Sequence, residues 1–315
     1  MSRVLITGVG GFTGRHLARL CAAAGDEVVG NGRSETASVE VAAYLRGDLT
    51  DAAQAAGVVR EAAPDRVFHL AAEASVARSW QDPAGTIEAN MSSTLNLLEA
   101  VRGHAPQART LVACSGEQYG PPERLPVDEQ HRFGPQNPYA VSKACVDLMT
   151  GVYADAFGLH TVRARAFNHA GPGQSDAYVV SSFARQIAQA EADGQSAVEI
   201  VTGNLEPRRD FTDVRDVVRA YRLALEHAEP GAYNVCSGRS SVIGDILAAL
   251  ARESPLDVRQ RTDPSLLREK EVMEIRGSHD KLSAATGWQP EIPLERTLRD
   301  ALDWWRERVR AEAAS

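Results

Sequence analysis

The sequence is poor in cysteine and in long apolar runs, and each scarcity excludes a class of protein. Four cysteines in 315 residues, with no CxxC pair among them, predict free thiols in a reducing compartment and no disulfide framework. No apolar run approaches the roughly 20 residues that a membrane-spanning helix needs. The glycine-rich start is too short for a secretion signal. We therefore expect a cytoplasmic protein that makes no contact with membrane.

Basic residues are scarce relative to acidic ones. The 34 lysines and arginines face 42 acidic residues, which gives a formal charge of -8. This balance argues against a general nucleic-acid-binding role, and an anionic ligand would need local arginines. The eight histidines are scattered without the spacing of metal ligands, so no metal site is predicted.

Short apolar stretches alternate with helical ones through the first half of the chain. Helical spacing is found at 12–24 and 51–62, and the expected strands cover 3–8, 27–32, 42–48, 65–72, 110–116 and 160–168. Such alternation predicts an α/β fold, a Rossmann-type doubly wound parallel sheet with helices on both faces.

The pattern changes after Phe167. A loop is expected at 168–174, a strand at 233–238, and helices at 179–193, 242–252 and 298–312. The second half therefore predicts a smaller C-terminal lobe, and a cleft between lobes is a favoured place for a ligand. We assign 1–167 to a first domain built on the parallel sheet and 168–315 mainly to a ligand-binding lobe, with segments near 205–235 returning to the first domain.

The stretch "ITGVGGFTG" places Gly8, Gly11 and Gly14 directly after the first strand, at the start of a helix. Glycines there permit a tight turn and a close approach of the backbone to a pyrophosphate, which the helix N-terminus favours. Phe12 and Thr13 lie in the same turn. A plain turn would need glycines too, but the position in a βαβ series favours a dinucleotide.

The second strand ends without the acidic residue that binds an NAD ribose. Arg33 is found there and could meet a 2′-phosphate, so NADP(H) is preferred and NAD(H) stays possible. Asp48, with Leu49 beside it, follows the third strand, where a carboxylate could accept from the adenine amine or cap the next helix. Small residues after the fourth strand would let a nicotinamide ribose lie close, or would merely pack: Leu70, Ala71 and Ala72.

Tyr139 and Lys143 are four residues apart in "NPYAVSK", so on a helix they share one face. Pro138 suits the first turn of that helix. A neighbouring ammonium would lower the pKa of the phenol and make Tyr139 a usable acid or base. Alone, the pair is more often a surface coincidence, but the glycine turn makes it more specific.

With these motifs the chain resembles the extended short-chain dehydrogenase/reductase family over nearly its whole length. The resemblance covers "TGVGGFTG", "GDLTD", "HLAAEASV", "SGEQYG", "YAVSK" and "FNHAGPGQ". It implies a Ser–Tyr–Lys triad of Ser115, Tyr139 and Lys143. In such a triad the lysine holds the nicotinamide ribose. Ser115 could otherwise satisfy a turn at the strand end.

Longer stretches of the second half resemble the branch of this family that acts on GDP-6-deoxyhexoses. That likeness implies NAD(P)H-dependent reduction of the C4 ketone of GDP-4-dehydro-6-deoxy-D-mannose to GDP-D-rhamnose. It also implies that Glu117 and Asn168 contact this GDP-linked 6-deoxy-4-keto-hexose, with Arg209 and Arg268 clamping its diphosphate. Each could instead be an ordinary surface or loop residue.

Other activities of the same branch stay open. GDP-mannose 4,6-dehydratases would use Glu117 as a base, but they carry threonine-serine-glutamate where this chain has Ser115-Gly116-Glu117. They also carry paired arginines where this chain reads "GPGQ". A 4-epimerase, a reductase giving the 6-deoxy-talose configuration and a non-catalytic redox sensor are further alternatives. Family members often dimerise through a four-helix contact, which helices near 92–103 and 139–157 could supply.

Overall fold

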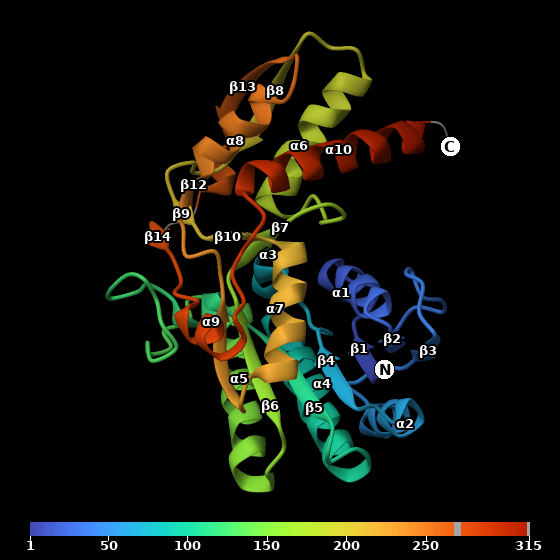
Figure 1. Cartoon of the computed structure of the whole chain (residues 1–315). Coiled ribbons are helices and arrows are strands. Elements are labelled where there is room, and N and C mark those ends of the chain that lie inside the picture. The colour runs from blue at the N-terminus through green and yellow to red at the C-terminus, as the bar shows by residue number, and fades with distance from the viewer. Residues whose placement is uncertain (268–271, 314–315) are drawn as a thin grey trace.

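A computed structural model of the chain describes residues 1–267 and 272–313. Its centre is a parallel sheet of seven strands in the order β11-β6-β5-β4-β1-β2-β3 (Figure 1). The strands of this sheet are β1 (Arg3–Thr7), β2 (Glu27–Gly32), β3 (Ala43–Arg46), β4 (Arg66–His69), β5 (Arg109–Ser115), β6 (Thr161–Ala166) and β11 (Gly231–Val235). The predicted Rossmann-type parallel sheet is confirmed.

Helices cover both faces of the sheet, as the alternation of the sequence predicts. The α-helices are α1 (Phe12–Ala23), α2 (Ala52–Ala62), α3 (Val76–Gln81), α4 (Pro83–His104), α5 (Pro138–Phe157), α6 (Val179–Ala192), α7 (Val214–His227), α8 (Ile243–Arg252), α9 (Asp280–Thr286) and α10 (Leu294–Ala313). Two 3-10 helices are also present, η1 (Gly116–Tyr119) and η2 (Pro264–Leu266).

Successive side chains of β1 point to opposite faces, so the strand contributes to two separate cores. Ile6 packs in the core under α1 and α7, with Leu17 and Val217. Leu5 packs in the core under α2, α4 and α5. Because both faces are buried, the strand sequence is a continuous apolar run.

The second lobe is built on α6, α8 and α10 (Figure 1, top). Its core buries Phe183 of α6, Leu250 of α8 and Trp305 of α10. Short strands complete the lobe and its junction: β7 (Asn168–Ala170), β8 (Ala197–Thr202), β9 (Arg208–Arg209), β10 (Phe211–Asp213), β12 (Ser241–Val242), β13 (Asp257–Thr262) and β14 (Glu274–Ile275).

The chain returns to the large sheet after entering the second lobe. β11 pairs in parallel with β6, and α7 packs in the core beside α1. The division of the chain at residue 167 stays a prediction.

Two local expectations were wrong, and one strand pairing was not predicted. The loop expected at 168–174 begins with β7, which pairs in parallel with β10. The last helix begins at Leu294, four residues earlier than expected. The pairing of β8 with β13 was not predicted, because polar and charged residues interrupt both strands.

All four cysteines are free thiols, as predicted, although Cys145 is only partly buried. Within the described residues, no helix combines the length and apolarity that crossing a membrane requires.

Candidate active site

The glycine turn after β1 is tightly packed. Gly8 has a φ of +66°, and a Cβ added at Gly14 would lie 2.4 Å from the Gly8 carbonyl oxygen. Gly11 is the N-cap of α1 and provides no side-chain cap, so the first N–H groups of the helix are left for another acceptor. A bare helix N-terminus of this kind suits the pyrophosphate of a dinucleotide.

The first turn of α1 also contacts the start of the second lobe. The Thr13 hydroxyl lies 3.1 Å from Nε2 of His169, and the Phe12 ring stacks on the His169 ring with centroids 5.9 Å apart. Nδ1 of His169 lies 3.1 Å from the Phe167 carbonyl, which assigns the proton to Nδ1 and makes Nε2 the acceptor. His169 was missed as a site residue because a lone histidine in a loop carries no sequence signal.

The sheet edge beyond β2 carries Arg33 and Asp48. Arg33 is exposed and close enough to Asp48 to contribute to a lowered pKa of that carboxyl, whose largest cause is the N–H of Thr50. Asp48 does not cap α2, since Asp51 accepts from the N–H groups of Ala53 and Gln54. The helix-cap alternative for Asp48 was therefore wrong, while contacts of Arg33, Asp48 and the buried Leu49 with a cofactor stay predictions.

The segment after β4 is fixed by a buried polar network. The N–H groups of Leu70 and Ala71 donate to the Thr7 hydroxyl, and Ala72 follows at once. His69 lies between Thr7, at 2.8 Å from Nδ1, and Thr94, at 3.0 Å from Nε2. Burial, with a smaller effect of Lys143, lowers the pKa of His69 to about 3. The histidine is therefore neutral and structural at ordinary pH.

Helix α5 begins as the sequence predicts. Asn137 caps it by accepting from the N–H of Ala140, and Pro138 occupies the first turn. Tyr139 and Lys143 follow on this helix at the predicted spacing.

Ser115 ends β5 and faces Tyr139. The Ser115 hydroxyl lies close enough to the phenol to act toward lowering its pKa. Ser115 Oγ also accepts from the N–H of Glu117 at 3.2 Å, so the hydroxyl caps η1 as well. Ser115 can therefore both cap η1 and donate a hydrogen bond to a substrate, because a hydroxyl has one proton and two lone pairs.

The pKa of Tyr139 is raised, not lowered as expected. The residue as a whole is half-buried, while its phenol is surrounded by protein groups. Burial of the phenol is the largest cause of the raised pKa. The nearby Glu117 and Tyr178 act in the same direction. The phenol therefore keeps its proton well above neutral pH, which suits a proton donor.

Lys143 does not reach the phenol. Its Nζ donates to the carbonyl oxygen of Ala113 at 2.7 Å, and burial lowers the pKa of the ammonium. The expected lowering of the tyrosine pKa by Lys143 was wrong for this reason. Tyr178, at the N-cap of α6, lies near Tyr139, and the sequence did not reveal this because nothing links the two residues along the chain.

The residues expected to bind substrate are spread over the second half. Asn168 begins β7, beside His169. Arg209 lies in the separate sheet β12-β9-β14, where its Nη1 donates to the Val272 carbonyl at 2.7 Å. Arg268 lies outside the described residues. Substrate contacts of these residues stay predictions.

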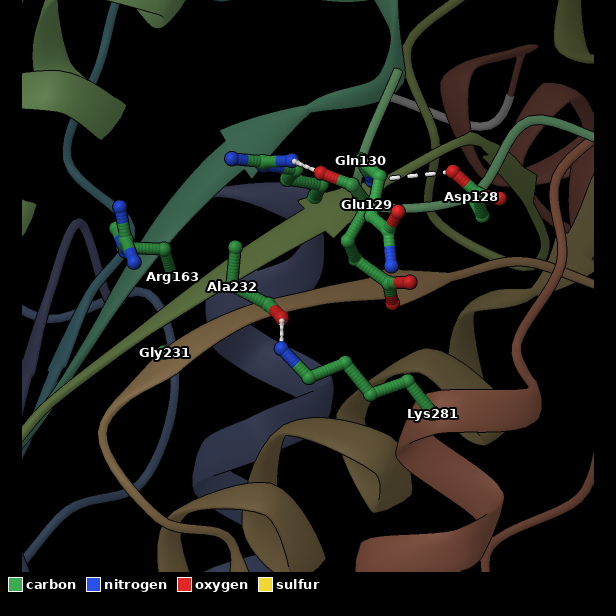
Figure 2. Close-up of a pocket in the computed structure, with 8 residues that line it drawn as sticks. Asp128, Glu129, Gln130, Arg163, Gly231, Ala232 and Lys281 are labelled. Atoms are coloured by element: carbon green, nitrogen blue, oxygen red, sulfur yellow. Dashed lines mark hydrogen bonds between the residues drawn. The ribbon is translucent and has the colours of Figure 1, made fainter.

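A cavity of about 450 Å³ lies elsewhere, beside β6 and β11 (Figure 2). In Figure 2, Arg163 points away from Lys281, whose Nζ donates to the Ala232 carbonyl at 2.9 Å. Two of its cations, Arg163 and Arg165, are paired with Asp147. The lining residues of this cavity are not among those predicted for the site: Asp128, Glu129, Gln130, Arg163, Arg165, Gly231, Ala232 and Lys281.

Comparison with known families identifies the family of this chain. A family model described as GDP-mannose 4,6 dehydratase matches residues 5–301. The chain belongs to this family. Membership in the GDP-mannose 4,6-dehydratase family confirms the resemblance to extended short-chain dehydrogenase/reductases.

Relatives of the family include both reductases and dehydratases. The chain is 37% identical over 313 residues to a GDP-6-deoxy-D-mannose reductase of Pseudomonas aeruginosa, covering 98% of this chain and 99% of the relative. It is 27% identical over 341 residues to a GDP-mannose 4,6-dehydratase of Yersinia enterocolitica, covering 94% and 91%. A solved structure, RMD from Pseudomonas aeruginosa complexed with NADPH, superposes with a TM-score of 0.87 at 36% identity, covering 98% of this chain and all of the other.

Proposed function

We propose that this protein is an NADPH-dependent reductase that converts GDP-4-dehydro-6-deoxy-D-mannose to GDP-D-rhamnose. The observation that carries the proposal is the grouping of Ser115, at the end of β5, with Tyr139 and Lys143 of α5. Lys143 donates to the Ala113 carbonyl of the same strand, and the phenol of Tyr139 holds its proton. Full-length similarity to a GDP-6-deoxy-D-mannose reductase supports the same substrate class. The reaction is an oxidoreduction typical of the family.

Gly8, Gly11, Phe12, Thr13 and Gly14 would hold the pyrophosphate at the bare N-terminus of α1. Arg33 and Asp48 would face the adenosine end, and the segment from Leu70 to Ala72 the nicotinamide ribose. The NADPH in the Pseudomonas aeruginosa RMD structure supports NADP(H), with NAD(H) as the alternative. When bound, the reduced cofactor supplies a hydride to C4.

In the proposed mechanism the protein's own groups position the ketone and provide the proton. The Ser115 hydroxyl donates to O4 and orients it. As charge develops on O4, Tyr139 transfers its phenolic proton to that oxygen, so that a secondary alcohol forms and solvent reprotonates the tyrosine. Lys143, held by the Ala113 carbonyl, would bind the cofactor's ribose with its remaining N–H groups.

Residue 116 favours reduction over dehydration. A Cβ at Gly116 would lie 3.0 Å from the ring of Phe167, so the serine that dehydratases carry there would force this ring to shift. Glu117 is retained beside Tyr139, where it could contact the sugar. The alternative of a 4,6-dehydratase would instead need Glu117 as a base at C5.

The assay separates the two reactions. Purified protein is incubated with the 4-keto sugar and NADPH while the absorbance of the reduced cofactor is followed. In a separate reaction it is incubated with GDP-mannose and NADP⁺, and the sugar is followed by NMR, because dehydration causes no net change in the cofactor. We expect rapid oxidation of NADPH with the keto sugar and no conversion of GDP-mannose. Conversion of GDP-mannose without reduction of the keto sugar would overturn the proposal. The NMR spectrum of the product distinguishes rhamnose from 6-deoxy-talose.

We further propose a homodimer that forms through α4 and α5. Leu148 and Val152 lie one helical turn apart on α5 and are 60% and 58% exposed, and Leu95 is an exposed apolar residue of the adjacent α4. Exposed apolar residues gathered over two packed helices are typical of an interface.

The four free thiols support the expected cytoplasmic location.

A further inference from the structure

Gln118 holds the backbone of Ser115 from within the protein. Its side-chain oxygen accepts from the N–H of Ser115 at 3.3 Å, and its side-chain nitrogen donates to Oδ2 of Asp147 at 3.0 Å. Gln118 and Asp147 are both fully buried. Because a carboxylate only accepts, the amide nitrogen must face Asp147 and the amide oxygen must face Ser115.

Asp147 is in turn held by Arg165. Nε and one terminal nitrogen of Arg165 donate to the two oxygens of the Asp147 carboxylate, at 2.7 and 2.9 Å. The other terminal nitrogen donates to the hydroxyl of Tyr119 at 2.9 Å and to the Glu129 carbonyl at 3.0 Å, a contact drawn in Figure 2. A bidentate pair of this kind fixes the direction as well as the distance of its partners.

The hydrogen-bond network of Asp147 and Arg165 therefore holds η1 at two adjacent residues. Gln118 is tied to Asp147 on α5, and Tyr119 is tied to Arg165 on β6. The same short helix is capped by Ser115 Oγ, which accepts from the N–H of Glu117. The orientation of the Ser115 hydroxyl thus depends on where η1 lies.

We propose that Gln118 is a positioning residue of the reaction, which acts through Ser115 to keep its hydroxyl directed at Tyr139 and at the substrate oxygen. This inference rests on the proposed function and extends it to a residue that touches neither substrate nor cofactor. The Asp147–Arg165 pair fixes the position of the Gln118 amide. One chain of hydrogen bonds therefore joins α5, which carries Tyr139, to β5, which carries Ser115.

The test replaces Gln118 with methionine, which has a similar length and shape but can make neither hydrogen bond. The value of kcat should fall by about 10- to 100-fold, because small misplacements of a catalytic group cost factors of this size. The KM values for NADPH and for the keto sugar should change by less than about threefold, since neither binding site is altered. Unchanged kcat in a folded Gln118→Met protein would overturn the proposal.

A double-mutant cycle separates positioning from general structural damage. In a Ser115→Ala background, Gln118→Met should reduce kcat by less than about threefold, because the hydroxyl that Gln118 orients is already absent. The same loss of kcat in both backgrounds would show a structural role only. If Gln118→Met does not fold, Gln118→Asn, which keeps the amide but shortens its reach, is taken through the same cycle.

The matched control is Thr150→Val on α5. Thr150 is fully buried, and its hydroxyl donates to the carbonyl of Val146 within the helix. This variant loses a buried hydrogen bond without altering Ser115, so its kcat should stay within about twofold of wild type.

A measurement without substrate tests the contact between Gln118 and Ser115 separately from the proposed reaction. Hydrogen exchange at the Ser115 amide should become faster in Gln118→Met and stay unchanged in Thr150→Val, because Gln118 accepts from that amide. A wild-type protein that does not reduce the keto sugar would contradict the proposed function alone. Unchanged exchange at Ser115 in Gln118→Met would contradict the role of Gln118 alone.

Discussion

Lys143 is bonded to Ala113, two residues before Ser115, through a hydrogen bond of 2.7 Å from its ammonium to the Ala113 carbonyl. This bond ties α5 to the end of β5 that carries Ser115. It explains why Lys143 and Tyr139 share a helix face without a direct bond between them. The tyrosine is left as a neutral phenol in a buried setting, close to Ser115.

Replacing Tyr139 with phenylalanine removes the proposed proton donor. We expect kcat to fall by roughly 10²- to 10⁴-fold, the usual contribution of general acid catalysis, with little change in the affinity for NADPH. Tyr153→Phe on the same helix is the matched control, because Tyr153 bonds to Glu99 and not to the site. Steady-state kinetics and fluorescence titration with NADPH measure both quantities. Near-normal turnover of Tyr139→Phe would exclude it as the acid.

Arg33→Ala tests the choice of cofactor. The guanidinium is exposed at the tip of β2, where it would pair with a 2′-phosphate. We expect the KM for NADPH to rise by about tenfold or more, since a charge-assisted bond is worth roughly 1.5–3 kcal/mol. NADH lacks the phosphate and serves as the internal control, with an unchanged KM. Equal effects on both cofactors would place the 2′-phosphate elsewhere.

His69 makes the stability of the protein depend on pH. Its pKa is about 3 in the folded protein and 6.5 in the unfolded chain, so between these values the unfolded chain binds the extra proton. The free energy of unfolding therefore falls as pH falls, by roughly 2 kcal/mol between pH 7.5 and pH 5 from this residue. Urea unfolding of wild type and His69→Gln at both values measures it. The variant should lose less stability on acidification, and an equal loss would contradict the assignment.

The buried ion pair of Arg165 and Asp147 should contribute far more to the free energy of unfolding than an exposed ion pair does. Arg165→Met removes the two short bonds to the buried Asp147 carboxylate and leaves only the longer contact of 3.4 Å with Arg163. Breaking a buried pair typically costs 3–5 kcal/mol, so we expect a loss of up to about that size. Arg259→Ala is the control, because its pair with Asp257 is exposed and should be worth no more than about 1 kcal/mol. Chemical denaturation measures both. Similar losses would show that the buried network is not stabilised by its charges.

The proposed dimer predicts an effect of a surface charge on assembly. Leu148→Glu places a carboxylate on the exposed face of α5, and we expect the dimer to dissociate because an unpaired charge would be buried in the interface. Leu266→Glu changes an equally exposed leucine in η2 and should leave the mass unchanged. Light scattering after size exclusion reports the mass. A wild-type monomer, or a dimer that persists in Leu148→Glu, would refute the contact.

The parallel sheet, the glycine turn and the start of α5 could be predicted because local patterns specify them. Apolar strands buried on both faces, glycines at a close approach and an Asn-Pro helix start leave few alternative structures. The resemblance to the family added Ser115, whose position at the end of β5 is where the structure has it. The pairing of β8 with β13 escaped prediction, because its side chains lack clear alternation.

What only the tertiary structure decided is the environment of each group. The sequence by itself determined that Tyr139 and Lys143 share a helix face, since that follows from helix periodicity alone. It could not reveal that burial raises the phenol's pKa or that Lys143 bonds to Ala113. Nor could it bring Tyr178 close to Tyr139 or His169 close to Thr13, or show that Gln118 bonds to Asp147. Desolvation and hydrogen bonding depend on which distant segments pack together, and spacing along the chain does not encode that.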